Sequence, residues 1–81
     1  MTAAEPDSQE ARVAAVSNWL SLYNLASYAE AFEEQGYDDL DYLLSQDRAW
    51  LHRVAIEMIG MLHGHAVKFA DRLQIAAAAA L

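Results

Sequence analysis

Cysteine is absent from the 81-residue sequence, and glycine (3 residues) and proline (1 residue) are rare. Without cysteine, disulfide-bonded scaffolds and thiol-ligated zinc or iron–sulfur sites are excluded. No apolar run approaches the roughly 18 residues that a membrane-spanning helix needs. Residues 1–7 also lack the basic and then apolar regions of a signal peptide. We therefore expect an intracellular, cytoplasmic protein that does not bind a membrane.

Basic residues are also scarce, because 5 Lys and Arg residues stand against 12 Asp and Glu residues and give a net charge of −7. This balance argues against binding to nucleic acid or to an anionic membrane. The charge is unevenly distributed: residues 1–47 hold ten acids and one base, Arg12, whereas residues 48–81 hold two acids and four bases. Such a division favours an interaction surface, the alternative being two exposed ends that happen to differ in charge.

Apolar residues are abundant and make up 56% of the chain, although 17 of them are alanine. The 28 larger apolar residues are enough for one compact core. Because β-branched residues, glycine and proline are few, the composition predicts a small all-α domain. A complete enzyme is not expected, since no Ser/His/Asp arrangement, glycine-rich phosphate loop or paired-carboxylate pocket is visible.

Helical spacing and capping signals predict five helices with short connections. Residues 1–10 are expected to be a disordered lead-in, and apolar residues at helical spacing indicate a first helix over about residues 11–23. Ser27 and Glu30 fit a capping box that would open a second helix. Gly36 follows where a helix end favours a residue of positive φ.

The remaining helices are predicted from the same kinds of signal. Asp38 or Asp39 would cap a short third helix, and Ser45 or Asp47 would cap a fourth. We expect Gly60 to end the fourth helix and His63-Gly64 to form a second break. A fifth helix would begin at residue 64 or 65, and the alanine-rich residues 76–81 would either extend it or fray. The domain itself is expected to span residues 11–75.

A core of helix-facing side chains follows from these assignments. Met58 is expected to fill gaps in that core. The other side chains expected there are Val16, Trp19, Leu20, Leu25, Tyr28, Phe32, Leu40, Leu43, Leu44, Val54, Ile59, Met61, Phe69 and Leu73.

An ordered set of motifs runs through these helices. The motifs are Val16-x-x-Trp19-Leu20, Leu25-x-x-Tyr28-x-x-x-Phe32, Gly36-Tyr37-Asp38-x-Leu40, and Ile59-Gly60-Met61 followed by Gly64-His65-x-x-Lys68. Together, from Val16 to Leu73, they resemble a sterile alpha motif (SAM) domain, which implies a compact five-helix bundle with a long C-terminal helix. The segment between Leu44 and Ile56 is longer than is usual in that family. We therefore expect a fourth helix that is lengthened at its N-terminus, with Trp50 and Leu51 covering extra core.

The resemblance implies a non-catalytic module for protein–protein interaction, often between one SAM domain and another. An acidic surface around the second to fourth helices would consist of Glu33, Glu34, Asp38, Asp39, Asp41 and Asp47. A second surface, at the N-terminal end of the fifth helix, would consist of His63, Gly64, His65, Lys68 and Arg72. Opposite charges on separate surfaces favour head-to-tail contact, which builds an oligomer or filament. The alternatives are a monomeric adaptor that binds a different protein and, for the acidic run, a solvated face with a capping aspartate.

Two other kinds of site are not expected. Some SAM domains bind RNA near the fifth helix, but this chain offers four bases there or nearby against a net charge of −7. His63 and His65 lie two residues apart, which places them on opposite sides of a helix. The sequence therefore predicts no metal site and no cofactor, and we expect His65 to form a hydrogen bond near the start of the fifth helix.

Overall fold

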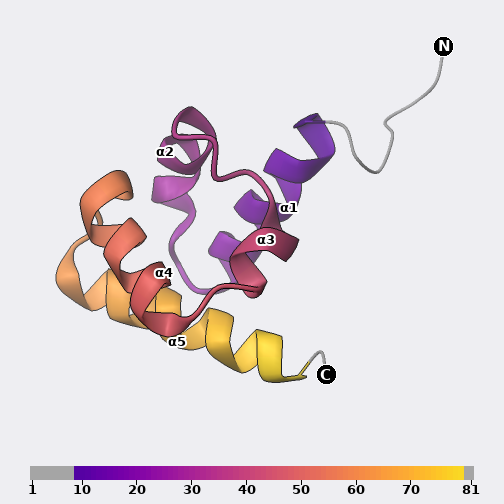
Figure 1. Ribbon diagram of the computed structural model, residues 1–81. Coiled ribbons are helices and arrows are strands. Elements are labelled where there is room, and N and C mark those ends of the chain that lie inside the picture. Colours follow the sequence, from indigo (N-terminus) through magenta and orange to yellow (C-terminus); the bar gives the residue numbers. More distant parts are fainter. Residues whose placement is uncertain (1–8, 80–81) are drawn as a thin grey trace, which may run out of the picture. The chain divides into compact units, whose positions relative to one another are not determined.

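The computed structural model describes residues 9–79, and all regular secondary structure in that range is helical (Figure 1). The elements are α1 (Gln9–Leu22), the 3₁₀-helix η1 (Ala26–Tyr28), α2 (Ala29–Glu34), α3 (Leu40–Leu44), α4 (Arg48–Val54), the π-helix η2 (Ala55–Ile59) and α5 (His63–Ala79). This confirms the predicted all-α class with a long C-terminal helix, because α5 has 17 residues. The chain divides between Leu40 and Asp41 into two packing units, each of which is described by itself.

In the first unit, α1 begins and ends slightly earlier than predicted. Residues 9 and 10 belong to the helix, so the predicted lead-in is too long at that end, and residues 1–8 lie outside the described part of the chain. The helix stops at Leu22 because Asn24 adopts a φ of 63°. The Leu25 amide then donates to the Leu20 carbonyl over 2.9 Å, which is the bond of a Schellman motif. Asparagine is one of the few residues that tolerate this left-handed conformation.

The predicted capping box at the start of α2 is wrong. Ser27 lies inside η1, and α2 follows Tyr28 without a side-chain capping bond. The Tyr28 and Ala29 amides instead donate to the Leu25 and Ala26 carbonyls, so backbone carbonyls already satisfy donors at this helix start. Gly36 has the predicted positive φ, at 82°, and ends α2.

The buried side chains of the first unit are Val16, Leu20, Leu25 and Phe32, each at most 3% exposed. Trp19 was expected in the core but is half-buried, and its ring packs against Tyr23 with centroids 4.9 Å apart. One residue is a turn of about 100° on a helix, so Trp19 cannot share the inward direction of Leu20. Tyr28 and Leu40, also expected in the core, are half-buried.

In the second unit, Asp47 caps α4. Its Oδ1 atom accepts a hydrogen bond from the Trp50 amide over 2.8 Å, whereas the Ser45 hydroxyl donates to the Tyr42 carbonyl. Of the two capping residues left open by the sequence, Asp47 is therefore the correct one. At the other end of this helical stretch, Gly60 has a φ of 81° and ends η2, as predicted.

The fourth helical stretch buries one side only. Leu51 is 1% exposed, whereas Trp50 is half-buried and its ring meets Tyr42 edge-on. Met58 is 45% exposed, so its assignment to the core is wrong. The neighbouring Ile59 takes the inward position instead.

Helix α5 packs beside α4 and η2 in this unit (Figure 1). It begins at His63, so the predicted break at His63-Gly64 is wrong. The Ala66 amide donates to the Leu62 carbonyl and closes the first turn, which leaves His63 and Gly64 inside the helix. The helix continues through Ala79, and the last two residues of the alanine-rich segment lie outside the described range.

Three alanines are buried where α5 packs beside α4 and η2. Ala55, Ala66 and Ala70 are all at most 1% exposed. Leu44, expected in the core, is half-buried, as is Ala77. The remaining buried side chains of the second unit are Leu43, Leu51, Val54, Ile59, Met61, Phe69 and Leu73.

Candidate interaction surfaces

The predicted acidic surface has four of its residues in the first unit. Glu33 and Glu34 end α2 and are exposed, and Asp39 is exposed in the segment that follows. Asp38 is half-buried, and its Oδ1 atom lies 4.0 Å from Nε of Arg12. The single base of the first unit thus faces one of the predicted acids, and the other three predicted acids of this unit are exposed.

The other two acidic residues belong to the second unit and have different roles. Asp41 is exposed in the first turn of α3. Asp47 is exposed but is engaged as the cap of α4. Asp47 therefore has the capping role for which the sequence offered it as one of two candidates, and its place in an interface stays a prediction.

All five residues of the predicted basic surface lie in the first three turns of α5. His65, Lys68 and Arg72 follow one another at spacings of three and four residues, which places them on one side of the helix. We call these three residues the cationic side of α5. His65 and Lys68 are half-buried and Arg72 is exposed. His63 and Gly64 are exposed at the first turn; Gly64, four residues before Lys68, lies on this side without a side chain, whereas His63 lies on another side. The hydrogen bond expected of His65 stays a prediction.

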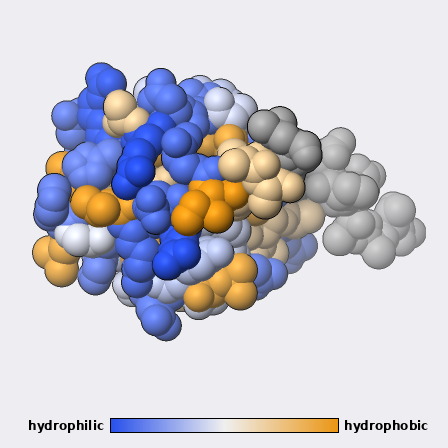
Figure 2. All heavy atoms as spheres, turned by 90° about the horizontal axis from the view of Figure 1, so that it is seen from below, coloured by the Kyte–Doolittle hydropathy of each residue, from blue (hydrophilic) through white to orange (hydrophobic). Residues whose placement is uncertain are grey.

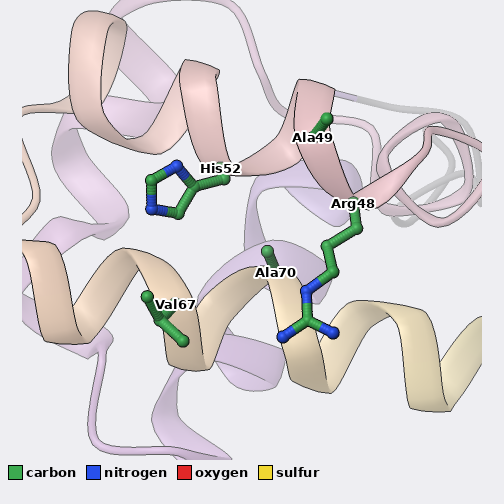
Figure 3. Close-up of a pocket in the computed structure, with 5 residues that line it drawn as sticks. All are labelled: Arg48, Ala49, His52, Val67 and Ala70. Carbon is green, nitrogen blue, oxygen red and sulfur yellow. The ribbon is translucent and has the colours of Figure 1, made fainter.

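A groove between α4 and α5 was not foreseen from the sequence. It has a volume of about 480 Å³ and is lined by Arg48, Ala49, His52, Val67 and Ala70 (Figure 3). Figure 3 shows the Arg48 side chain reaching from α4 towards α5, and the His52 ring lying in the space between the two helices. Nη2 of Arg48 lies 3.2 Å from Oδ1 of Asp71, which ties the two helices together across the groove.

Two histidines meet beside this groove. The rings of His52 in α4 and His63 in α5 have centroids 5.5 Å apart and planes inclined by 78°. This contact cannot be inferred from the sequence, because the two residues are on different helices. Within residues 9–79, no group of three or more histidine, cysteine or acidic side chains is suitably placed for a metal ion.

Exposed apolar side chains are present but dispersed. On the face drawn in Figure 2, hydrophobic residues lie among hydrophilic ones. The large apolar residues that are most exposed are Leu22, Tyr42, Met58, Leu62, Val67 and Ile75. Among the helices that the structure describes, none has the length and apolar character needed to cross a membrane.

These features define a small all-α domain that carries charged side chains on exposed surfaces. A family model for the SAM domain (sterile alpha motif) matches residues 9–75, and the chain belongs to this family. SAM domains are generally protein-interaction modules, often with other SAM domains as partners, and are typically non-catalytic. The resemblance inferred from the motifs is thereby confirmed. No curated protein and no solved structure matches the chain.

Proposed function

We propose that this SAM domain associates head to tail with a second copy or with another SAM domain. The contact would join exposed carboxylates of the first unit, chiefly Glu33, Glu34 and Asp39, to the cationic side of α5. This assignment makes the domain a non-catalytic scaffold for assembly. Because the two surfaces differ, each partner would keep one of them available, so the contact can propagate into an open filament unless it closes into a ring.

The observation that carries this proposal is the position of Asp71. It is the one acidic residue of α5, and it lies next to Arg72 in the sequence. Its carboxylate is directed to Arg48 on α4, 3.2 Å away. Lys68 and Arg72 therefore lie with His65 on one side of α5, and the carboxylate nearest to them along the helix is the one directed to Arg48.

The start of α5 adds to the attraction for carboxylates. The first turn of an α-helix presents amides without intrahelical partners and the positive end of the helix dipole. Both features stabilise an incoming anion. Partner carboxylates near His63 and Gly64 would gain from this field as well as from Lys68.

The small free energy of an exposed ion pair and its screening by ions predict an association that depends on salt concentration. A single exposed ion pair contributes about 0 to 1 kcal/mol, so several pairs and an accompanying apolar contact are needed for stable association. The Debye length is about 10 Å at 0.1 M salt and about 3 Å at 1 M. Association should therefore weaken as ionic strength rises.

Sedimentation velocity of two charge-reversal variants tests the proposal. Glu33→Lys disables the acidic surface and Lys68→Glu the cationic side, so each alone should sediment as a monomer. An equimolar mixture should form heterodimers, because each variant keeps the surface that the other lacks. Glu33 is preferred to Asp39 because it lies at the end of α2, where a lysine suits the helix dipole.

Matched controls come from charges outside both surfaces. Glu57→Lys and Arg53→Glu repeat the two reversals at exposed positions of η2 and α4, and both should assemble like the unaltered domain. The proposal is wrong if Glu33→Lys and Lys68→Glu also assemble normally. A domain that stays monomeric at every concentration would instead support the adaptor alternative.

A further inference from the structure

The contact between His52 and His63 has no role in the association proposed above. His52 lies one turn after Arg48 on α4 and is half-buried, and its ring occupies the space between the helices (Figure 3). His63 is the first residue of α5 and is exposed. The two rings meet at a centroid separation of 5.5 Å with nearly perpendicular planes.

This separation agrees with joint ligation of one metal ion. Zinc binds imidazole nitrogen at about 2.0–2.1 Å in tetrahedral geometry, so each ring centroid lies about 3 Å from the ion and the two centroids about 5 Å apart. The observed distance, 5.5 Å, exceeds that value by about half an ångström. Because His63 is exposed at the first turn of α5, its side chain has room to rotate and direct a nitrogen towards the ion.

The positive end of the α5 dipole lies at His63 and opposes a cation, so coordination by two imidazole nitrogens has to outweigh it. Helix α4 holds two bases, Arg53 next to His52 in the sequence and Arg48 four residues before it, and Arg48 shares the side of the helix that carries His52. Its guanidinium is paired with Asp71 at 3.2 Å, so a carboxylate opposes its charge. The other groove-lining residues, Ala49, Val67 and Ala70, are uncharged.

The geometry points to a two-histidine site for a divalent transition-metal ion of the zinc class, formed by His52 and His63. Imidazole is a preferred ligand of zinc, nickel and copper and a poor one for magnesium or calcium. Within the described residues no third protein ligand completes the set, so water would fill the open positions. A bound ion would link α4 to the first turn of α5 and stabilise the fold in proportion to its occupancy.

Titration calorimetry with zinc chloride tests the site on tag-free protein. Unaltered protein should bind one zinc ion per chain and should give no heat with magnesium chloride. Loss of a metal ligand should exceed the effect of losing a supporting group, so His52→Gln and His63→Gln should each weaken zinc binding at least about tenfold. His65→Gln is the matched control, because it removes the third histidine of α4 and α5, and it should bind zinc as the unaltered protein does.

Circular dichroism of each variant without metal shows whether it folds. Should a variant fail to fold, imidazole NMR signals of the unaltered protein decide the question. Zinc should shift the His52 and His63 signals together and leave those of His65 in place. Absence of zinc binding, equal weakening by His65→Gln, or a shift confined to one of the paired histidines would each overturn the inference.

Discussion

Replacing Asp47 tests whether this residue acts as a helix cap or as part of an interface. Its Oδ1 atom accepts the Trp50 amide over 2.8 Å at the start of α4, and no other acidic residue lies in the first turn of that helix. Replacement by alanine removes this side-chain acceptor from the start of α4. Asparagine keeps an acceptor oxygen of the same reach but removes the negative charge.

The expected losses differ between the two substitutions. Replacement of a capping aspartate by alanine costs about 1 kcal/mol, within a range of about 0.5–2. In a domain of this size that loss lowers the melting temperature by about 4–8 °C. Asparagine is an equally good cap and loses only the interaction of a charge with the helix dipole, about 0.3–1 kcal/mol at an exposed site. The order of stability should therefore be aspartate, then asparagine, then alanine.

Urea denaturation followed by far-ultraviolet circular dichroism measures these differences. Sedimentation of the folded asparagine variant completes the experiment, because a purely capping role leaves association unchanged. Equal stability of Asp47→Ala and the unaltered domain would refute the capping role. An asparagine variant as unstable as the alanine variant would show that charge, and not hydrogen bonding, is what α4 requires from residue 47.

Three further outcomes are expected. Phe69→Ala should cost about 3–5 kcal/mol, because this ring is 1% exposed, and thermal denaturation should show a melting temperature lowered by about 12 °C or more. Gly60→Ala should cost about 1–2 kcal/mol through its φ of 81° alone, since no atom lies within 4 Å of an added Cβ; a smaller change in urea denaturation would show that the helix end relaxes. A hairpin RNA should show no salt-dependent mobility shift with micromolar protein, since the net charge is −7.

Local signals predicted the helix ends where the deciding interactions are themselves local. Gly36 and Gly60 were identified because positive φ favours glycine. Asp47 was one of two candidates for the cap of α4, with Ser45, and the sequence did not decide between them. Ser27 satisfied the same kind of rule and yet lies in a 3₁₀-helix. The Tyr28 and Ala29 amides there donate to the backbone carbonyls of Leu25 and Ala26, and not to the Ser27 hydroxyl. The left-handed Asn24 was missed because asparagine is a weaker signal than glycine.

Predicting burial and the site required knowledge of which helix sides meet. The apolar spacing around Met58 and Ile59 indicates a helix but does not say which of two adjacent apolar residues faces inward. The pairing of Arg48 with Asp71 and the contact of His52 with His63 both depend on the packing of α4 against α5. Neither the spacing along one helix nor the composition of the chain specifies that packing.

The side chains of α5 form three groups, which lie on different sides of the helix and have different roles. One side buries Ala66, Phe69, Ala70 and Leu73. A second side, at intervals of four residues, carries His63, Val67 and Asp71, which contact His52, line the groove and bind Arg48 respectively. The cationic side is the third. Since Asp71 is held on the second side by Arg48, packing within the unit also determines the charge that α5 presents to a partner, and the α4–α5 contact thereby connects the fold to the proposed association.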